Sequence, residues 1–323
     1  MIRAGALALL LLASCAKEPT APSVTVPEER ASRPEATPEV MRGEQLLVNG
    51  QLDEAQRAFE SAIDANPDDA RAWLDLGLAL EARNQLEAAM KAYEKSVAID
   101  PAFAEALNNL GVLQRESGDL AASIASLERA AALDPDFTAA RFNLGLAYED
   151  AKRIDDAEAE YLATIEQTPG DPIPRINLAM MYLEVDRLED AAAQLRSCVP
   201  SVRNDVLLSI AVGEGFRRAE HPEEAIPVLQ NALQVAGEPP PTELLAELSL
   251  AYYAVEDYDA AEKLMGQAVK QNELDPAIHY AYGSILAKQG KVGKARTHLR
   301  RAESLDPDGP YAARARKRLD SLR

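Results

Sequence analysis

Apolar and small residues recur along this chain with a period of 34 residues. The clearest copy lies in the stretch 70–101, where the repeated positions are Trp73, Leu76, Gly77, Leu80, Ala89, Tyr93 and Pro101. At most of these positions the same or similar residues stand 34 places earlier and 34 places later. A fixed period of this length predicts a stack of small units, each of which buries its apolar face on its neighbours.

The repeat keeps one register over most of the chain. Abundant Ala, Leu and Glu, together with the absence of alternating Val/Ile runs, favour an all-α chain. Each unit is therefore predicted to be two helices joined by a turn, and residues 310–323 are predicted to form a capping helix. Eight units fit residues 36–309, with two prolines left over: 36–69, 70–103, 104–137, 138–171, 172–205, 206–239, 242–275 and 276–309.

This pattern resembles the tetratricopeptide repeat family over residues 36–309. The resemblance implies an all-α solenoid that forms a right-handed superhelix. Glycine is costly inside a helix and needs a packing reason. We expect the glycines of the first helices to let the second helices approach closely; they are Gly43, Gly77, Gly111, Gly145, Gly213 and Gly283.

Two further features follow from the register. The turns between paired helices favour a left-handed residue, and Gly50, Asn84, Gly118 and Gly290 occupy that place. Unit five departs from the pattern, because Pro200 comes early and Arg203 replaces the expected final proline. We therefore predict a joint at residues 200–206 that separates two stacked segments.

Residues 1–14 resemble a bacterial lipoprotein signal peptide. Arg3 precedes an apolar run, residues 4–13, which is long enough for a signal and too short to span a bilayer. The sequence LASC that ends at Cys15 resembles a lipobox, which implies cleavage before Cys15 and lipidation of this residue. The alternative is an ordinary signal peptide with an incidental cysteine.

The lipoprotein resemblance also implies a location. Three acyl chains anchor a protein stably, and Ala16, which is not an aspartate, favours the outer membrane of a two-membrane bacterium, on its periplasmic side. Residues 15–35 are rich in Pro, Thr, Ser and Glu without apolar periodicity. They are predicted to be a solvated tether between the anchor and the repeats.

Composition excludes several functions. The formal net charge of −19 argues against nucleic-acid binding, which needs a high density of basic residues. Two cysteines, Cys15 and Cys198, exclude a disulfide framework. The three histidines, His221, His279 and His298, lack metal-ligand spacing, and no catalytic or phosphate-binding motif occurs. We predict no enzymatic activity, no cofactor and no metal site.

The resemblance places a binding surface on the first helices, which line the concave face of such arrays. The sixth place of four successive units is polar, and is occupied by Asp75, Asn109, Asn143 and Asn177. Asn is unfavourable inside a helix, whereas its amide can pair with a peptide backbone. The row is either a peptide-binding ladder or a set of bonds within the stack.

An apolar stripe is expected beside this row, in units four and five. Exposed apolar patches mark binding surfaces, and a partner helix or unfolded segment could cover this one. Some of its members could instead belong to the core. The stripe comprises Phe142, Leu146, Ile173, Ile176, Met180 and Leu183. The carboxylate clamp of chaperone-binding relatives is disfavoured, because Asn108, Val112 and Ala139 occupy its basic places.

These features lead to one hypothesis and two alternatives. The first is a lipid-anchored envelope scaffold that binds peptide or helical segments of partner proteins and assists assembly of an envelope complex. The second is a pilotin-like factor for type IV pilus secretins. The third is a cell-wall-binding protein that acts through a basic C-terminal end, since residues 288–323 hold eleven basic and four acidic residues and could meet an anionic partner.

Overall fold

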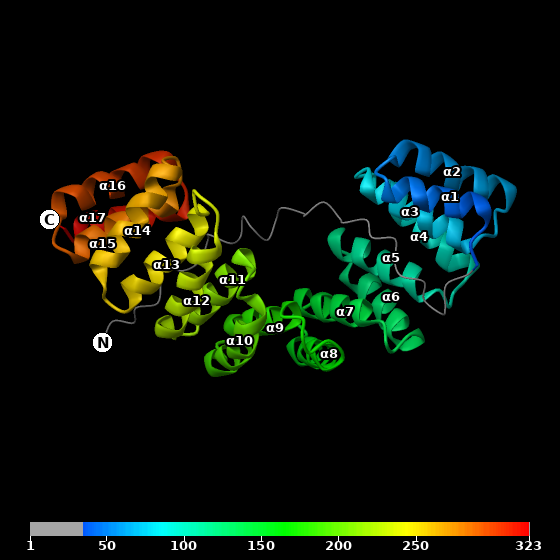
Figure 1. The fold of residues 1–323 in the computed structure, drawn as a ribbon, viewed down its shortest axis with the longest axis horizontal. Helices are drawn as coiled ribbons and strands as arrows, with labels where there is room; N and C mark the ends of the chain where they lie inside the picture. Colours follow the sequence, from blue (N-terminus) through cyan, green and yellow to red (C-terminus); the bar gives the residue numbers. More distant parts are fainter. Residues whose placement is uncertain (1–34, 323) are drawn as a thin grey trace. The chain divides into compact units, whose positions relative to one another are not determined.

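A computed structural model describes residues 35–322, which form seventeen helices and no strand (Figure 1). The helices group into two compact units, one ending at Pro169 and one starting at Gly170. In the N-terminal unit each helix packs on the next one along the chain. Its eight helices are α1 (Pro38–Val48), α2 (Leu52–Ala65), α3 (Ala70–Ala82), α4 (Leu86–Ile99), α5 (Ala104–Glu116), α6 (Leu120–Leu133), α7 (Thr138–Asp150) and α8 (Ile154–Gln167).

The C-terminal unit continues the same alternation and ends with a single helix. Its helices are α9 (Ile173–Glu184), α10 (Leu188–Val202), α11 (Val206–Arg218), α12 (Pro222–Val235), α13 (Thr242–Ala254), α14 (Tyr258–Gln271), α15 (Pro276–Lys288), α16 (Val292–Leu305) and α17 (Pro310–Asp320). Within each unit, alternate helices such as α1 and α3, or α9 and α11, also contact one another. The described part of the chain is therefore an all-α solenoid of paired helices.

The predicted joint at 200–206 is misplaced. Helix α10 continues through Pro200 to Val202 and packs on α11. The boundary between the compact units lies instead at Pro169 and Gly170. There the sequence reads TPGDP, and Pro172 delays the start of α9, which is one residue shorter than the other first helices of its unit. The two prolines and the glycine of this turn break the helical pattern more strongly than Pro200 does.

The predicted close packing within each helix pair is confirmed. A Cβ atom added at Gly77 would lie 2.3 Å from Tyr93, and one added at Gly213 would lie 2.5 Å from Leu229. These distances are far shorter than a normal contact, so only glycine fits. The large residues of the second helices are fully buried against the first helices; they are Phe59, Tyr93, Leu127, Tyr161, Leu195, Leu229, Met265 and Leu299.

The predicted left-handed turns are also confirmed. Gly50, Asn84, Gly118 and Gly290 have φ angles of 74°, 59°, 88° and 74°. Four other units place an ordinary residue in the same conformation: Lys152, Asp186, Glu220 and Glu256, with φ between 61° and 64°. The packing of the helix pair thus imposes this turn even where the residue is unfavourable for it.

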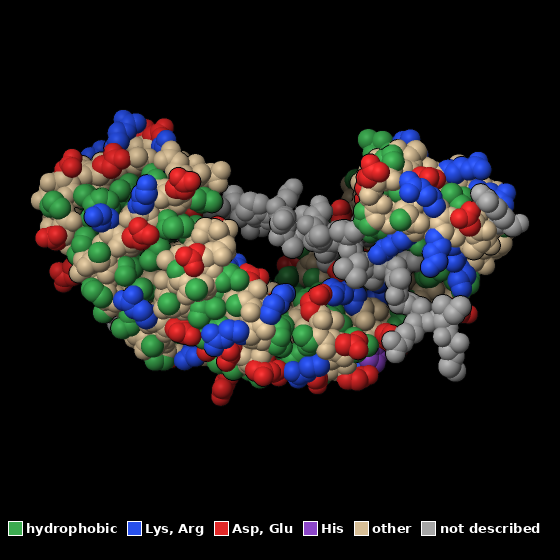
Figure 2. All heavy atoms as spheres, turned by 180° about the vertical axis from the view of Figure 1, so that it is seen from behind, with side chains coloured by type: hydrophobic (Ala, Val, Ile, Leu, Met, Phe, Trp, Pro, Cys, Tyr) green, Lys and Arg blue, Asp and Glu red, His purple; other side chains and the backbone are tan. Residues whose placement is uncertain are grey.

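Helix α17 closes the C-terminal end, as predicted. Tyr311, Ala312 and Ala315 are buried against the last helix pair, and the ring of Tyr311 packs on that of Tyr280 with 5.7 Å between their centroids. Of its basic residues, Arg316 and Lys317 are exposed, whereas Arg314 and Arg318 are only partly exposed. Across the face that Figure 2 shows, acidic and basic side chains are interspersed with apolar ones.

Two predictions fall outside the described residues. The signal peptide and the lipidated Cys15 lie there, as does nearly all of the tether. Within residues 35–322, no helix is both long enough and apolar enough to cross a membrane.

Candidate functional site: the surface of the first helices

The polar row begins in the core of the N-terminal unit. Asp75 is only 1% exposed, and its Oδ2 lies 3.9 Å from Nε of Arg71, which in turn pairs with Glu44 at 2.7 Å. This buried group joins α3 to α1. Buried charges are stable only when they are paired. Asp75 therefore holds neighbouring first helices together rather than lying on an open surface, and a role for it in peptide binding stays a prediction.

The next two members of the row join a network of amides. Asn143 on α7 donates from Nδ2 to Oδ1 of Asn108 on α5 at 2.9 Å, and Asn108 donates to Asn109 at 3.0 Å. Asn109 and Asn143 are both partly exposed. Bonds within the stack thus use part of each amide, and Asn143 keeps its side-chain oxygen for another donor. The bonds within the stack are thus observed, and peptide binding by Asn109 and Asn143 stays a prediction.

The predicted apolar stripe is divided between the two units. Phe142 and Leu146 belong to the N-terminal unit, where both are partly exposed and the ring of Phe142 packs on Tyr161 with 5.9 Å between centroids. Ile173, Met180 and Leu183 belong to the C-terminal unit and are at least partly exposed, whereas Ile176 is buried at 7% exposure. Ile176 is therefore a core residue, as the alternative for this stripe anticipated.

In the C-terminal unit, α9 and α11 lie side by side and form an apolar surface. Ile173 opens α9 and is 44% exposed, and Leu207, at the equivalent place of α11, is 72% exposed. Sequence reasoning missed Leu207, although its place in the repeat matches that of Ile173. Asn177 lies one turn further along α9 and donates from Nδ2 to the carbonyl oxygen of Ile173 at 2.9 Å. Its own side-chain oxygen is left for a partner's N–H group.

Charged residues border this apolar surface. Arg218 donates to Glu184 at 2.6 Å, lies 3.8 Å from Glu214, and also contacts the sulfur of Met180 at 3.8 Å. Arg217 pairs with the buried Glu247 on α13 at 2.9 Å. Burial, helped by the charge of Glu247, raises the pKa of Glu214 to about 7. The border of the surface therefore carries a carboxyl that changes charge near neutral pH.

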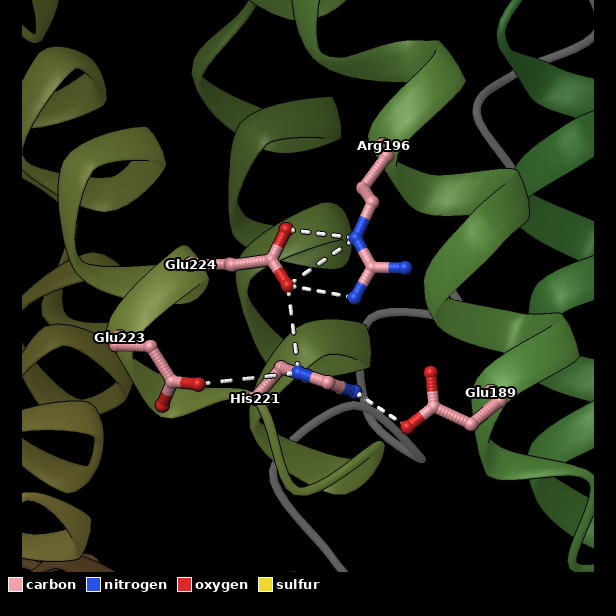
Figure 3. Close-up of polar contacts among 5 residues, drawn as sticks. All are labelled: Glu189, Arg196, His221, Glu223 and Glu224. Atoms are coloured by element: carbon pink, nitrogen blue, oxygen red, sulfur yellow. Dashed lines mark hydrogen bonds and ion pairs between the residues drawn. The ribbon is translucent and has the colours of Figure 1, made fainter.

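A second polar cluster joins α10 to the start of α12 (Figure 3). One ring nitrogen of His221 lies 3.2 Å from Glu189, and the other lies 3.3 Å from Glu224 and 3.8 Å from Glu223. Arg196 donates from Nη2 to Glu224 at 2.7 Å and from Nε to both oxygens of Glu224, at 2.9 and 3.1 Å, and it lowers the pKa of this carboxyl. The histidine that seemed isolated in the sequence thus takes part in a network that ties two second helices together.

The other two histidines contact each other. Nδ1 of His279 lies 2.9 Å from Nδ1 of His298, and Nε2 of His279 lies 3.0 Å from the carbonyl oxygen of Glu273. Since a carbonyl only accepts, His279 carries its proton on Nε2 and accepts from His298. Burial lowers the pKa of His298. Within residues 35–322, no group of three His, Cys, Asp or Glu side chains has an arrangement that could hold a metal ion.

The basic C-terminal helix combines paired and unpaired residues. Arg316 donates to Glu303 at 2.7 Å and to the carbonyl oxygen of Pro307 at 2.7 Å. Among the described residues, Arg314, Lys317 and Arg318 form no ion pair with a carboxylate. The guanidinium of Arg314 lies over the ring of Tyr311 at 5.6 Å from its centroid. Arg318 hydrogen-bonds Tyr253, and Arg314 and Arg318 are both only partly exposed. Lys317 is therefore the most accessible of these three residues for an anionic partner.

Paired helices in a stack, with a partly exposed apolar surface on successive first helices, define a helical-repeat scaffold that is suited to protein–protein interaction. The chain belongs to the tetratricopeptide repeat family. One model of this repeat matches residues 40–104, 108–172 and 246–310, and a second model of the repeat matches residues 172–197. Proteins of this family bind peptides or other proteins. A comparison with curated proteins found no match.

Solved structures support the fold. The chain is similar to one in the Cut9–Hcn1 assembly of APC/C, with 20% identity and a TM-score of 0.54 over 87% of this chain and 55% of that one, so it spans about half of that protein. The chain is 16% identical to yeast Tom70, with a TM-score of 0.54 over 93% of this chain and 67% of that one. It is 14% identical to a tetratricopeptide repeat protein of Parabacteroides merdae, with a TM-score of 0.56 over 77% of this chain and 97% of that one. At these identities the similarity shows the fold alone.

Proposed function

We propose that this protein is a lipid-anchored scaffold of the bacterial cell envelope, on the periplasmic side of the outer membrane, which binds segments of partner proteins on its first helices. The observation that carries the binding role is the surface of α9 and α11. Ile173 and Leu207 expose apolar side chains at equivalent places of successive units, 44% and 72% of each being accessible. Large exposed apolar side chains that line up on one surface mark interaction sites.

The chemistry of this surface suits an extended or helical segment. Ile173 and Leu207 supply apolar contacts, and Met180 adds an adaptable side chain of the kind found on binding surfaces. The free oxygen of Asn177 can accept from a main-chain N–H whatever the partner's side chains are. Assistance in the assembly of an envelope complex is the role that such a site would serve in an anchored protein.

Charge substitution tests the surface directly. Ile173→Glu with Leu207→Glu should abolish co-purification of partners from envelope extracts, because a partner would have to bury two carboxylates without counter-charges. Leu274→Glu is the matched control, since Leu274 is 69% exposed in the loop before α15. Ile173 and Leu207 are both exposed, so the double substitution should leave folding unaffected. Equal partner recovery with the double variant would refute the site.

The anchoring role rests on the sequence LASC and the apolar run before it. With Cys15→Ala the protein should move from the membrane fraction to the soluble fraction of the envelope, because it loses its acyl chains. An unchanged membrane fraction would exclude lipidation at Cys15 as the anchor. The partner-binding surface would be unaffected by that result.

A second candidate function, binding to an anionic polymer of the cell wall, is favoured by one observation. Arg314, Lys317 and Arg318 are without ion pairs among the described residues, in a protein whose net charge is −19. Retention on purified peptidoglycan that decreases with Arg314→Gln, Lys317→Gln and Arg318→Gln would support it. Retention that is unchanged by these substitutions would exclude it.

A further inference from the structure

A depression with an apolar floor lies between α3 and α4, and it is separate from the surface proposed above. Its volume is about 510 Å³, within the range of small binding pockets. Leu76 and Leu80 of α3 and Ala92 of α4 form its floor and are nearly buried, at 7%, 7% and 3% exposure. An apolar side chain that entered the depression would meet carbon on several sides.

Trp73 supplies the aromatic side of this depression. Its indole Nε1 donates to the carbonyl oxygen of Pro67 at 2.9 Å, which fixes the orientation of the ring, and the side chain remains partly exposed. A rigid aromatic ring loses little conformational freedom when a partner binds, so it makes an effective anchor. At the same place, later units have smaller or charged residues, such as Leu107, Arg141 and Arg175. This second unit therefore differs from the others on this surface.

The charged residues beside the depression indicate the sign of the charge that a partner should carry. Lys91 and Lys95 lie one turn apart on α4, both line the depression, and both are exposed. Among the described residues, neither lysine forms an ion pair. Glu94 also lines the depression, which leaves one net positive charge there. Unpaired lysines beside an apolar floor, in a chain of net charge −19, complement carboxylates next to an apolar side chain.

From these observations we propose that the depression is a second docking site, and that it takes an acidic segment of another protein through a leucine-like side chain. The apolar side chain lies against Trp73, Leu76 and Leu80, while flanking carboxylates pair with Lys91 and Lys95. The scaffold would then hold two partners at once, one on α9 and α11 and one in this depression.

Trp73 is the sole tryptophan of the chain, so its fluorescence reports on this site. The probe is a hexapeptide of two leucines flanked on each side by two glutamates, titrated into the full chain bearing Cys15→Ser. We expect saturable movement of the emission to shorter wavelength, as the ring loses contact with water. A counterpart peptide with lysines in place of the glutamates should cause no saturable change.

Substitutions locate the effect. Lys91→Glu with Lys95→Glu should weaken binding of the glutamate peptide at least about tenfold, because two attractions become repulsions. Lys263→Glu with Lys270→Glu, two exposed residues of α14, changes the net charge equally and should leave binding unaltered. Ala88→Leu, at an exposed position that lines the depression, should reduce binding by filling it.

Several results would overturn the proposal. The first is an emission that the glutamate peptide leaves unchanged, and the second is an equal response to the lysine peptide. A shift that depends on protein concentration without peptide would assign the site to a second copy of the chain. A shift with anionic lipid vesicles but not with the peptide would assign it to a membrane.

Discussion

Gly77→Ala is the sharpest test of how the helix pairs are held together. The added Cβ would lie 2.3 Å from Cε1 and 2.5 Å from Cδ1 of Tyr93, where carbon atoms normally approach to about 3.5–4.0 Å. Tyr93 cannot swing away. It is fully buried, and its hydroxyl donates to Glu81 at 2.7 Å.

The magnitude follows from two opposing effects. Overpacking of a well-ordered core costs about 1–3 kcal/mol, and the fixed ring of Tyr93 places this site at the upper end. Alanine regains about 1 kcal/mol over glycine through its helix propensity. The free energy of unfolding should therefore fall by about 2 kcal/mol.

Urea denaturation followed by Trp73 fluorescence measures this loss, since Trp73 lies on the same helix as Gly77. Gly293→Ala in α16 is the control, because a Cβ added there meets no atom within 4 Å. Far-UV circular dichroism should show it to be as stable as the wild type, or about 0.5 kcal/mol more stable. A Gly77→Ala protein of unchanged or greater stability would refute the packing role of the glycine.

Three further predictions follow from other parts of the chain. Burial raises the pKa of Glu214 from its ordinary value of 4.5 to about 7. Between these two pH values the folded protein therefore keeps a proton on Glu214 that the unfolded chain releases. Stability should then fall as pH rises from about 4.5 to about 7, and denaturation at several pH values should show a flatter profile for Glu214→Gln; identical profiles would contradict this. Glu220→Gly should stabilise the protein by up to about 1 kcal/mol in thermal unfolding, since Glu220 has a φ of 64°, and a loss of stability would show that its side chain matters more than its backbone. Cys198 is 1% exposed, and burial raises its pKa to about 11. In the Cys15→Ser protein a thiol reagent should therefore react with Cys198 at least tenfold more slowly before urea is added than after. Equal reaction rates would contradict the burial of Cys198.

Much of the fold could be predicted because the repeat ties each residue type to one packing role. Gly77 and Tyr93 face each other in the structure as the register required, and Gly50 and Gly118 adopt the expected left-handed turns. The boundary at Pro169 and Gly170 was missed. The position of this boundary depends on how strongly the prolines and the glycine of one turn break the helical pattern. Pro200, by contrast, is accommodated within α10.

The site was predicted less well, because place in the repeat does not determine exposure. Asp75 and Ile176 occupy places expected to be open, yet they are buried, at 1% and 7% exposure. Leu207 was missed although it is far more exposed. His221 contacts Glu189, 32 positions away, and His298 contacts His279, 19 positions away, and both contacts depend on how the helices pack.

The central claim is that the first helices of the C-terminal unit bind segments of partner proteins. In-cell photo-crosslinking from Asn177, Met180 and Leu207 tests it most directly, with Leu274 as a control of high exposure outside that surface. We predict that the three surface positions capture the same discrete partners, at yields well above that of Leu274, and that Ile173→Glu removes the products. Capture from the three positions that does not exceed capture from Leu274 would contradict the claim.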